Sequence, residues 1–510
     1  MQKRMETIEV RTRQTGEEQT ITNMNAVPEL QQNPNRMNKA LILLVFLPCL
    51  IVSLRLDNDI WFLLTSGRYV LEHGIPFLEP FTLHQNFSFV MQQWLSAVIF
   101  WGVYSKLGAV GIIALVFVVF VATVAVIVLL TRHLSSGNPV AMFFTSLFAS
   151  AALKTVMVTR PMMFTMLILA LELYLLERFI SGKNWKFLLP LPILSALLIN
   201  LHAAMWPIQF VILLPYLIDS FSFRFLFLQG QGYPKRYLFP AVGAMALAGF
   251  LNPYGLSAMT YVFRSYGFAE IGMVLEMQPA DINHASGMLI FGLFFLMLAI
   301  YMLKKNRSTR LRYALLSLGT AVLALSSIRS FALFAACGIF PLAYLLRDVE
   351  LPKGRIQSQK NVLRLRAVLI ALVALTICTV LVQRVQQAVE EGEAPEASRA
   401  VEYLLTREDT EHMTLYTGYN DGGYAEFRGL KPYIDPRAEV FVKKNNGAKD
   451  VMKEYYNLQY GQVYYKDVLD NYGFTHLLVS RDDILSVYLP RDDAYECIYV
   501  DEMYQIFRHR

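Results

Sequence analysis

A series of long apolar runs, separated by short polar segments, fills this sequence from about residue 40 to residue 384. A helix of about 20 apolar residues crosses the hydrocarbon core of a bilayer, because each residue adds about 1.5 Å to a core about 30 Å thick. Only 17% of the 510 residues are charged, whereas soluble domains average about a quarter. The pattern predicts a polytopic α-helical, multi-pass protein of the cell membrane.

The charges of the loops decide which segments cross. The apolar run Trp94–Tyr104 is too short for a full crossing, and if it crossed, the basic segments 178–186 and 304–312 would face outward. Basic loops favour the cytoplasmic side, so we expect 93–105 to lie flat in the membrane interface, within a first outer loop over 56–108. The N-terminus is then cytoplasmic, and about eleven crossings follow. They are expected at 38–55, 109–131, 139–157, 161–181, 187–201, 204–220, 237–251, 285–303, 311–326, 329–346 and 366–384.

The same patterns divide the chain into three regions. Residues 1–37 are polar and lack helical periodicity, which is typical of a disordered cytoplasmic tail. Residues 38–384 form the transmembrane domain, and residues 385–510 form a small α/β domain that the crossing count places outside the cytoplasm. In that domain we expect helices at 397–405, 449–456 and 466–472, strands at 413–417 and 476–479, a turn at Gly422–Gly423 and a hairpin over 494–508.

Charge and cysteine content exclude several classes of function. The net charge of +6 is small for this length, and the positive residues lie in loops beside the spans, so no nucleic-acid surface is expected. The four cysteines form no CxxC motif or Cys/His cluster. This argues against a disulfide framework and against a structural zinc site.

Polar residues collect at one rim of the predicted membrane domain. Once the spans are assigned to sides, carboxylates, arginines, amides and a histidine all fall on the outer face. The ionisable residues are nearly absent from the centres of the spans, where transporters place theirs. The distribution therefore indicates a site at the outer rim. The residues concerned are Asp57, Asp59, Arg160, Asn200, His202, Asn252, Glu270, Glu276 and Arg329.

Asp57 and Asp59 stand directly after the first span. Two carboxylates at this spacing can bind a divalent metal ion, or one of them can act as a general base towards an acceptor hydroxyl. Carboxylates are also common at helix ends, where they are simply hydrated. The pattern therefore establishes no cofactor, and it leaves Asp57 and Asp59 as candidate ligands of a divalent metal ion.

The first outer loop contains four segments in a characteristic order: Asp59–Gly67, Glu72–Pro76, Glu79–Thr82 and Gln93–Leu95. With these segments the loop resembles that of a group of bacterial multi-pass proteins related to the GT-C superfamily of glycosyltransferases, which includes protein mannosyltransferases and aminoarabinose transferases. Further matches, in chain order, are Arg160–Pro161, Asn200–His202, Asn252–Gly255, Ser327–Arg329, Gly422–Phe427 and Tyr433–Arg437. The chain departs from the pattern at Leu63, where a histidine is frequent, at Glu79, where an aspartate is expected, and at Gln93, where an acidic residue is expected.

The resemblance implies a GT-C-like fold and an integral-membrane glycosyltransferase. Its donor is a sugar on a polyprenyl phosphate delivered from the membrane lipids, and its acceptor is a glycan, lipid or protein outside the cytoplasm. Asp59 matches the essential acidic residue of the first outer loop in those enzymes, and Asp57 accompanies it as a catalytic candidate. The alternatives are a transporter or flippase without catalysis, and a scaffold for cell-envelope glycan assembly.

The other candidates have roles that follow from their chemistry. Arg160 and Arg329 suit the donor phosphate, because a guanidinium pairs bidentately with phosphate oxygens, but both can instead snorkel to lipid headgroups. Asn200, His202 and Glu276 are substrate-binding candidates, although a lone histidine is more often an interfacial residue with satisfied hydrogen bonds. Aromatic residues near Asp59 suit either sugar stacking or an interfacial belt: Trp61, Phe62, Tyr69, Phe77, Phe81 and Trp94. In the C-terminal domain, Asp421, Asp435 and Arg437 suit acceptor recognition or docking onto the outer loops.

Overall fold

The structure is a computed structural model that describes residues 42–51, 53, 55–225, 228–265, 278–303, 309–349 and 395–510. Several expectations lie outside the described residues. They are the tail over 1–37, the last span over 366–384, and the site candidates Glu270 and Glu276.

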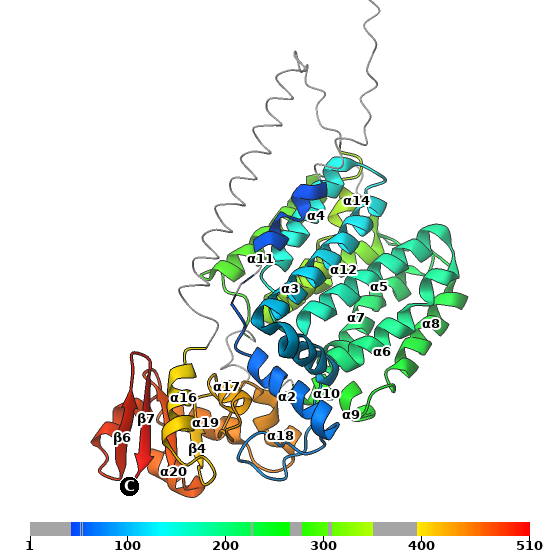
Figure 1. Cartoon of the computed structure of the whole chain (residues 1–510). Helices are drawn as coiled ribbons and strands as arrows, with labels where there is room; N and C mark the ends of the chain where they lie inside the picture. The colour runs from blue at the N-terminus through cyan, green and yellow to red at the C-terminus, as the bar shows by residue number, and fades with distance from the viewer. Residues whose placement is uncertain are drawn as a thin grey trace, which may run out of the picture.

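Most of the predicted spans are helices that pack side by side in one bundle (Figure 1). Local sequence sets their limits. At the start of the second helix of the bundle, for example, the Asn138 side chain accepts hydrogen bonds from the N–H groups of Val140 and Ala141, and Pro139 takes the first helical position. The helices are α4 Pro139–Leu153, α5 Met162–Gly182, α6 Leu191–Leu201, α7 Trp206–Asp219, α8 Lys235–Ala248, α11 Ala285–Leu303 and α12 Leu311–Ser326.

Helix α3, Trp94–Leu134, consists of two helices joined at Gly108. The backbone of Gly108 has φ 62° and ψ −157°, a conformation that side chains with a Cβ rarely adopt, so glycine is required at this break. The expectation of a short helix, separate from the span at 109–131, is confirmed. That the short helix lies flat in the membrane stays a prediction. Within the described residues, α3 alone is long and apolar enough to cross a membrane, and the count of eleven crossings is not confirmed.

The span expected over 329–346 is not one regular helix. It consists of η6 Ile328–Ser330, α13 Phe331–Leu333, the π-helical turn η7 Phe334–Gly338 and α14 Leu342–Leu345. Glycine is required within this turn, because a Cβ at Gly338 would lie 2.3 Å from the hydroxyl of Thr320 on α12. The turn leaves the Gly338 carbonyl free to accept a hydrogen bond from the Ser317 hydroxyl, 2.9 Å away.

The interior of the helical bundle contains several buried ionisable side chains. The buried guanidinium of Arg312, on α12, pairs with Glu177 of α5 at 2.8 Å and with Asp219 of α7 at 2.7 Å. These ion pairs tie three helices together. Glu172, further along α5, is fully buried, and neither carboxylate oxygen has a hydrogen-bond partner in the described part of the chain. Glu172 is therefore an exception to the expectation that span centres nearly lack ionisable residues.

The C-terminal domain contains a four-stranded sheet in the order β4-β5-β7-β6. Strands β4 Leu415–Thr417 and β5 His476–Ser480 run parallel, whereas β6 Tyr495–Val500 and β7 Tyr504–His509 form the expected antiparallel hairpin. Its helices include α16 Ser398–Arg407, α17 Gly422–Phe427, α19 Val451–Gln459 and α20 Tyr465–Tyr472. The predicted turn at Gly422–Gly423 is wrong, because these glycines begin α17. A Cβ at Gly422 would lie 1.8 Å from the Ile434 carbonyl oxygen, so close approach rather than a turn explains this glycine.

The first outer loop packs into the C-terminal domain, which lies at one end of the bundle beside α2 Ile60–His73 (Figure 1). The loop residues Phe81, Phe87 and Phe89 are buried in the same core as Tyr416 and Tyr433.

Two of the aromatic residues near Asp59 have a packing role. The ring of Trp61 lies 5.0 Å from those of Tyr424 and Phe427 on α17, and Trp61 is only 5% exposed. Trp61 and Phe81 therefore join the loop to the C-terminal domain, and a role of the aromatic residues in sugar stacking or in a membrane belt stays a prediction.

Candidate active site

The carboxylates of Asp57 and Asp59 are held at the start of α2. The backbone N–H of Asp57 donates to the Thr159 hydroxyl at 2.9 Å, which ties the loop to the segment before α5. The Asp57 carboxylate accepts the N–H of Asp59 at 3.1 Å. Asp59 occupies the N-cap position of α2, yet its side chain makes no capping hydrogen bond. Its carboxylate instead pairs with the side chain of Arg160.

Arg160 lies between these two carboxylates. Its Nε is 2.8 Å from Asp57 Oδ1 and 3.2 Å from Asp59 Oδ2. All three side chains are about a quarter exposed to solvent. The guanidinium thus offsets the repulsion between two carboxylates that the chain holds close together. Pro161 follows directly, and α5 begins at Met162, so the helix start sets the position of the arginine.

A cavity of about 350 Å³ opens onto this ion-pair cluster. Its polar lining residues come from the first outer loop, from the start of α5, from the end of α6 and from η6. The rest of the lining is mainly apolar, with Val156, Met162 and Phe331 among it. The polar residues are Asp57, Asp59, Gln93, Thr155, Arg160, His202 and Arg329, of which Thr155 lies in the segment between α4 and α5. The structure therefore brings five of the predicted site residues together, from four separate parts of the chain.

Two of these cavity residues are held by the ends of helices. His202 follows α6, is almost fully buried, and shares a hydrogen bond of 2.9 Å with the Thr165 hydroxyl through Nδ1. Arg329 lies in η6, where the N–H of Ile328 donates to the Gln278 carbonyl oxygen at 3.0 Å. Both side chains thus reach the cavity from backbone that is fixed by hydrogen bonds.

A second, more polar cavity of about 600 Å³ meets the first one at Asp57 and Val158. It lies between the first outer loop and the C-terminal domain. Asn58, from the loop, donates a hydrogen bond to the Asn420 carbonyl oxygen across this boundary. Its charged lining residues are Arg55, Asp57, Glu396, Asp421 and Asp482. Asp57 is therefore accessible from a mainly apolar cavity on one side and from a polar cavity on the other.

Asn200 and Asn252 hold backbone in place. The amide of Asn200 accepts from Trp94 Nε1 at 2.9 Å and donates to the carbonyl oxygens of Ala196 and Leu251, both at 2.7 Å. It is not among the described residues that line the cavity. Asn252 caps its own turn by accepting the N–H of Tyr254 at 2.8 Å. Neither amide contributes to the cavity that contains Asp59.

Gln93 is a cavity residue that sequence reasoning did not select. Its side-chain oxygen is buried and has no hydrogen-bond partner within the described part of the chain, although the residue lines the cavity. A buried amide oxygen without a partner suits a hydrogen-bond donor on a bound ligand, such as a sugar hydroxyl. The signal was present in the sequence, because Gln93 stands at the position where the resemblance leads one to expect an acidic residue.

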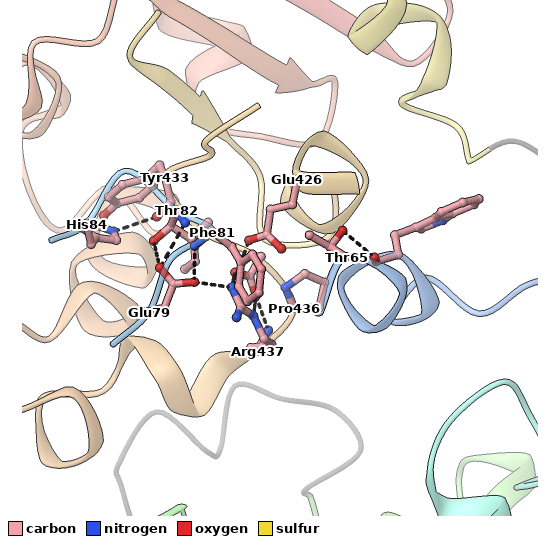
Figure 2. Close-up of polar contacts among 12 residues, drawn as sticks. Thr65, Glu79, Phe81, Thr82, His84, Glu426, Tyr433, Pro436 and Arg437 are labelled. Carbon is pink, nitrogen blue, oxygen red and sulfur yellow. Dashed lines mark hydrogen bonds and ion pairs between the residues drawn. The ribbon is translucent and has the colours of Figure 1, made fainter. Parts of the chain in front are cut away.

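A buried ionic cluster, defined here as Arg437 with Glu79, Glu426 and Asp435, joins the loop to the C-terminal domain (Figure 2). Arg437 Nη2 lies 3.0 Å from Glu79 Oε1 and 3.0 Å from Glu426 Oε1, and it also pairs with Asp435. Burial raises the pKa of Glu426 well above its ordinary value, against the opposing charge of Arg437. Burial also opposes ionisation of Asp435, but Arg437 outweighs it and lowers the pKa of that carboxyl. Within the cluster, the pKa of Glu426 is thus shifted towards the protonated form and the pKa of Asp435 towards the ionised form.

No protein-family model and no curated protein matches the chain. Solved structures do match. The crystal structure of the Archaeoglobus fulgidus oligosaccharyltransferase tethered to an acceptor peptide has a TM-score of 0.54 at 12% identity, over 88% of this chain and 69% of that one. The apo structure of ArnT from Cupriavidus metallidurans has a TM-score of 0.51 at 12% identity, over 93% of this chain and 97% of that one.

The chain has the fold of the GT-C glycosyltransferases. The expected resemblance is thus confirmed at the level of the fold. The archaeal enzyme AglB has also been solved with dolichol-phosphate and an inhibitory peptide, at a TM-score of 0.52 and 11% identity, over 88% of this chain and 69% of that one. A further structure of the archaeal enzyme contains zinc and sulfate, at a TM-score of 0.50 and 11% identity, over 86% of this chain and 67% of that one.

Proposed function

We propose that the protein is an integral-membrane glycosyltransferase that transfers a sugar from a polyprenyl-phosphate donor to an acceptor outside the cytoplasm. One observation carries the proposal: two aspartates and two arginines from distant parts of the chain line a single cavity of about 350 Å³. The GT-C fold supports it. The dolichol-phosphate in a structure of AglB is a lipid phosphate of the chemical class proposed here as the donor's carrier.

In the proposed reaction, Asp59 is the general base. It takes the proton from an acceptor hydroxyl while that oxygen forms a bond to the anomeric carbon of the sugar. The bond from the anomeric carbon to the donor phosphate breaks, and the lipid phosphate leaves with the electron pair. The configuration at that carbon is inverted. Arg329, with Arg160 nearby, stabilises the negative charge that remains on the phosphate.

The two neighbouring cavities, which share Asp57 and Val158 as lining residues, suit two different substrates. The mainly apolar cavity suits the lipid-linked donor, with Gln93 and His202 as hydrogen-bonding partners for its sugar. The polar cavity beside the C-terminal domain suits a hydrophilic acceptor, either a glycan, a lipid headgroup or a protein segment. Asp57 and Asp59 then lie where the two substrates meet. In this arrangement the N-terminus is cytoplasmic and the C-terminal domain is outside.

The decisive experiment uses the purified full-length protein with a panel of polyprenyl-phosphate sugars, and it measures release of the free lipid phosphate. We expect release with at least one donor, and a loss of roughly 100-fold or more in the Asp59→Asn protein. Asp409→Asn is the matched control, because Asp409 is an exposed surface aspartate that pairs with His412. Binding of a donor without any turnover, or full activity in the Asp59→Asn protein, contradicts the proposal. The first of these results points to a scaffold.

A further inference from the structure

We infer that the guanidinium of Arg160 takes the place that a divalent metal ion would occupy between Asp57 and Asp59, so that this protein needs no resident metal at its site. The inference deepens the proposed function and rests on the same cavity. The sequence suggested a divalent metal ion at the two aspartates, and one structure of the archaeal oligosaccharyltransferase contains zinc. The inference is that Arg160 replaces such an ion in this protein.

The geometry of the carboxylates carries the inference. A single nitrogen, Nε of Arg160, lies 2.8 Å from Asp57 Oδ1 and 3.2 Å from Asp59 Oδ2. These are distances of charge-assisted hydrogen bonds, and the guanidinium stands where the two anionic oxygens converge. A metal ion bridging the same oxygens at about 2.0 to 2.6 Å would have to displace the arginine.

Among the described residues, the remaining groups in the cavity do not favour a dication. The described part of the chain contains no group of three or more His, Cys, Asp and Glu side chains that could hold a metal ion. Among described residues, the other charged side chain that lines the cavity is Arg329, so two positive charges balance the two aspartates. His202 Nδ1 is already engaged by Thr165. Hard cations take about six oxygen ligands, whereas these residues offer two carboxylates that already pair with a cation.

The arginine also explains how Asp59 is positioned. Its guanidinium is planar and remains charged at all physiological pH values, so it provides a permanent cation with directed N–H bonds. The contact with Asp59 draws that carboxylate towards the cavity and away from the start of α2, where it makes no capping hydrogen bond. Arg160 is thus a positioning residue for the proposed base, and it supplies the positive charge that a metal ion would otherwise supply.

The test measures Mn²⁺ binding to the purified full-length protein by electron paramagnetic resonance. We expect the wild type to bind Mn²⁺ no more tightly than about 1 mM, because the aspartates are already paired. Arg160→Gln removes the internal cation and leaves two adjacent carboxylates, so we expect its affinity for Mn²⁺ to rise at least about tenfold. Arg160→Lys keeps the charge and is expected to bind Mn²⁺ as weakly as the wild type. The triple variant Arg160→Gln, Asp57→Asn, Asp59→Asn is expected to lose the gain.

Micromolar binding of Mn²⁺ to the wild type that disappears in the Asp57→Asn and Asp59→Asn proteins would overturn the inference, and this result needs no Arg160 variant to fold. An Arg160→Gln protein that elutes as the wild type does on size exclusion yet gains no affinity would overturn it as well.

Sugar transfer provides a second readout once a donor is known. We expect wild-type transfer to persist in EDTA, and Mn²⁺ to restore part of the activity that Arg160→Gln loses. Loss of wild-type transfer in EDTA with recovery on adding Mn²⁺ would contradict the inference. If no donor is turned over, the proposed function fails, and the Mn²⁺ measurements still decide what lies between the aspartates.

Discussion

Arg437 and Glu79 are 358 positions apart in the sequence, yet Arg437 Nη2 lies 3.0 Å from Glu79 Oε1 in a buried ion pair. Glu79 belongs to the first outer loop, and it also accepts hydrogen bonds from the backbone of Phe81 and Thr82. This ion pair therefore anchors the loop that carries Asp59 to the C-terminal domain. This explains how a domain remote in sequence can determine the geometry of the candidate active site.

Removing the cation of this cluster is expected to destabilise the junction strongly. Arg437→Met leaves Glu79, Glu426 and Asp435 buried without their partner, and breaking a buried pair in this way costs about 3 to 5 kcal/mol. Hydrogen exchange of the β5 amides measures the loss. Glu426→Gln is the matched control, because burial shifts the pKa of Glu426 towards the protonated form, which an amide resembles, and we expect it to cost less than about 1 kcal/mol. Equal losses in the two variants would contradict the assignment of charge.

Asp421 is expected to make the C-terminal domain more stable in mild acid. Burial raises its pKa to about 6, although the Tyr504 hydroxyl, 2.8 Å away, favours the ionised form. Because the folded-state pKa lies above the unfolded value, the stabilisation is fully present below about pH 4 and is lost as the pH rises through 6. Relative to Asp421→Asn, the wild type should lose about 2 to 3 kcal/mol between pH 4 and pH 7. Hydrogen exchange in β5 at several pH values checks this, and a pH-independent difference would refute it.

Arg329 is expected to bind the donor phosphate. Arg329→Met should weaken binding of a polyprenyl phosphate by about 10- to 100-fold, because it removes a charge-assisted contact at a site of mainly apolar surface. Binding of the lipid phosphate to purified protein, measured by thermophoresis or by displacement of a labelled analogue, tests this without any need for turnover. Arg508→Met is the control, since Arg508 pairs with Glu408 and Glu496 on the surface of the C-terminal domain. If the Arg329→Met protein binds the polyprenyl phosphate as tightly as the wild type, Arg329 does not bind the donor phosphate.

Cysteine labelling tests the proposed orientation of the protein in the membrane. After replacement of the exposed Cys497, single cysteines at Glu72, Asn283 and Asp409, all exposed, should react with an impermeant maleimide added outside intact cells. A cysteine at Lys183, which is also exposed, should react only after permeabilisation. Labelling of the Asp409 position solely from the cytoplasm would separate the C-terminal domain from the outer face and break up the proposed site.

Much of the local structure was predictable, because it depends on patterns within one segment. Apolar runs identified the helices from α4 to α8, and the balance of basic residues indicated that 93–105 is separate from the span that follows. The hairpin of β6 and β7 also follows from local patterns. The same reasoning failed at Gly422, because a glycine required by close packing cannot be distinguished in sequence from a turn glycine.

The sequence by itself determined where most helices begin and end, and which side chains had the chemistry for a site at the outer rim. Only the tertiary structure decided which of them meet. Arg160 and Asp57 form an ion pair although they are 103 positions apart. The amide of Asn200, by contrast, forms its hydrogen bonds with Trp94 and with backbone carbonyl oxygens. The physical reason is range: hydrophobic periodicity acts within a helix or strand, whereas ion pairs and hydrogen bonds between distant side chains exist only once the helices have packed.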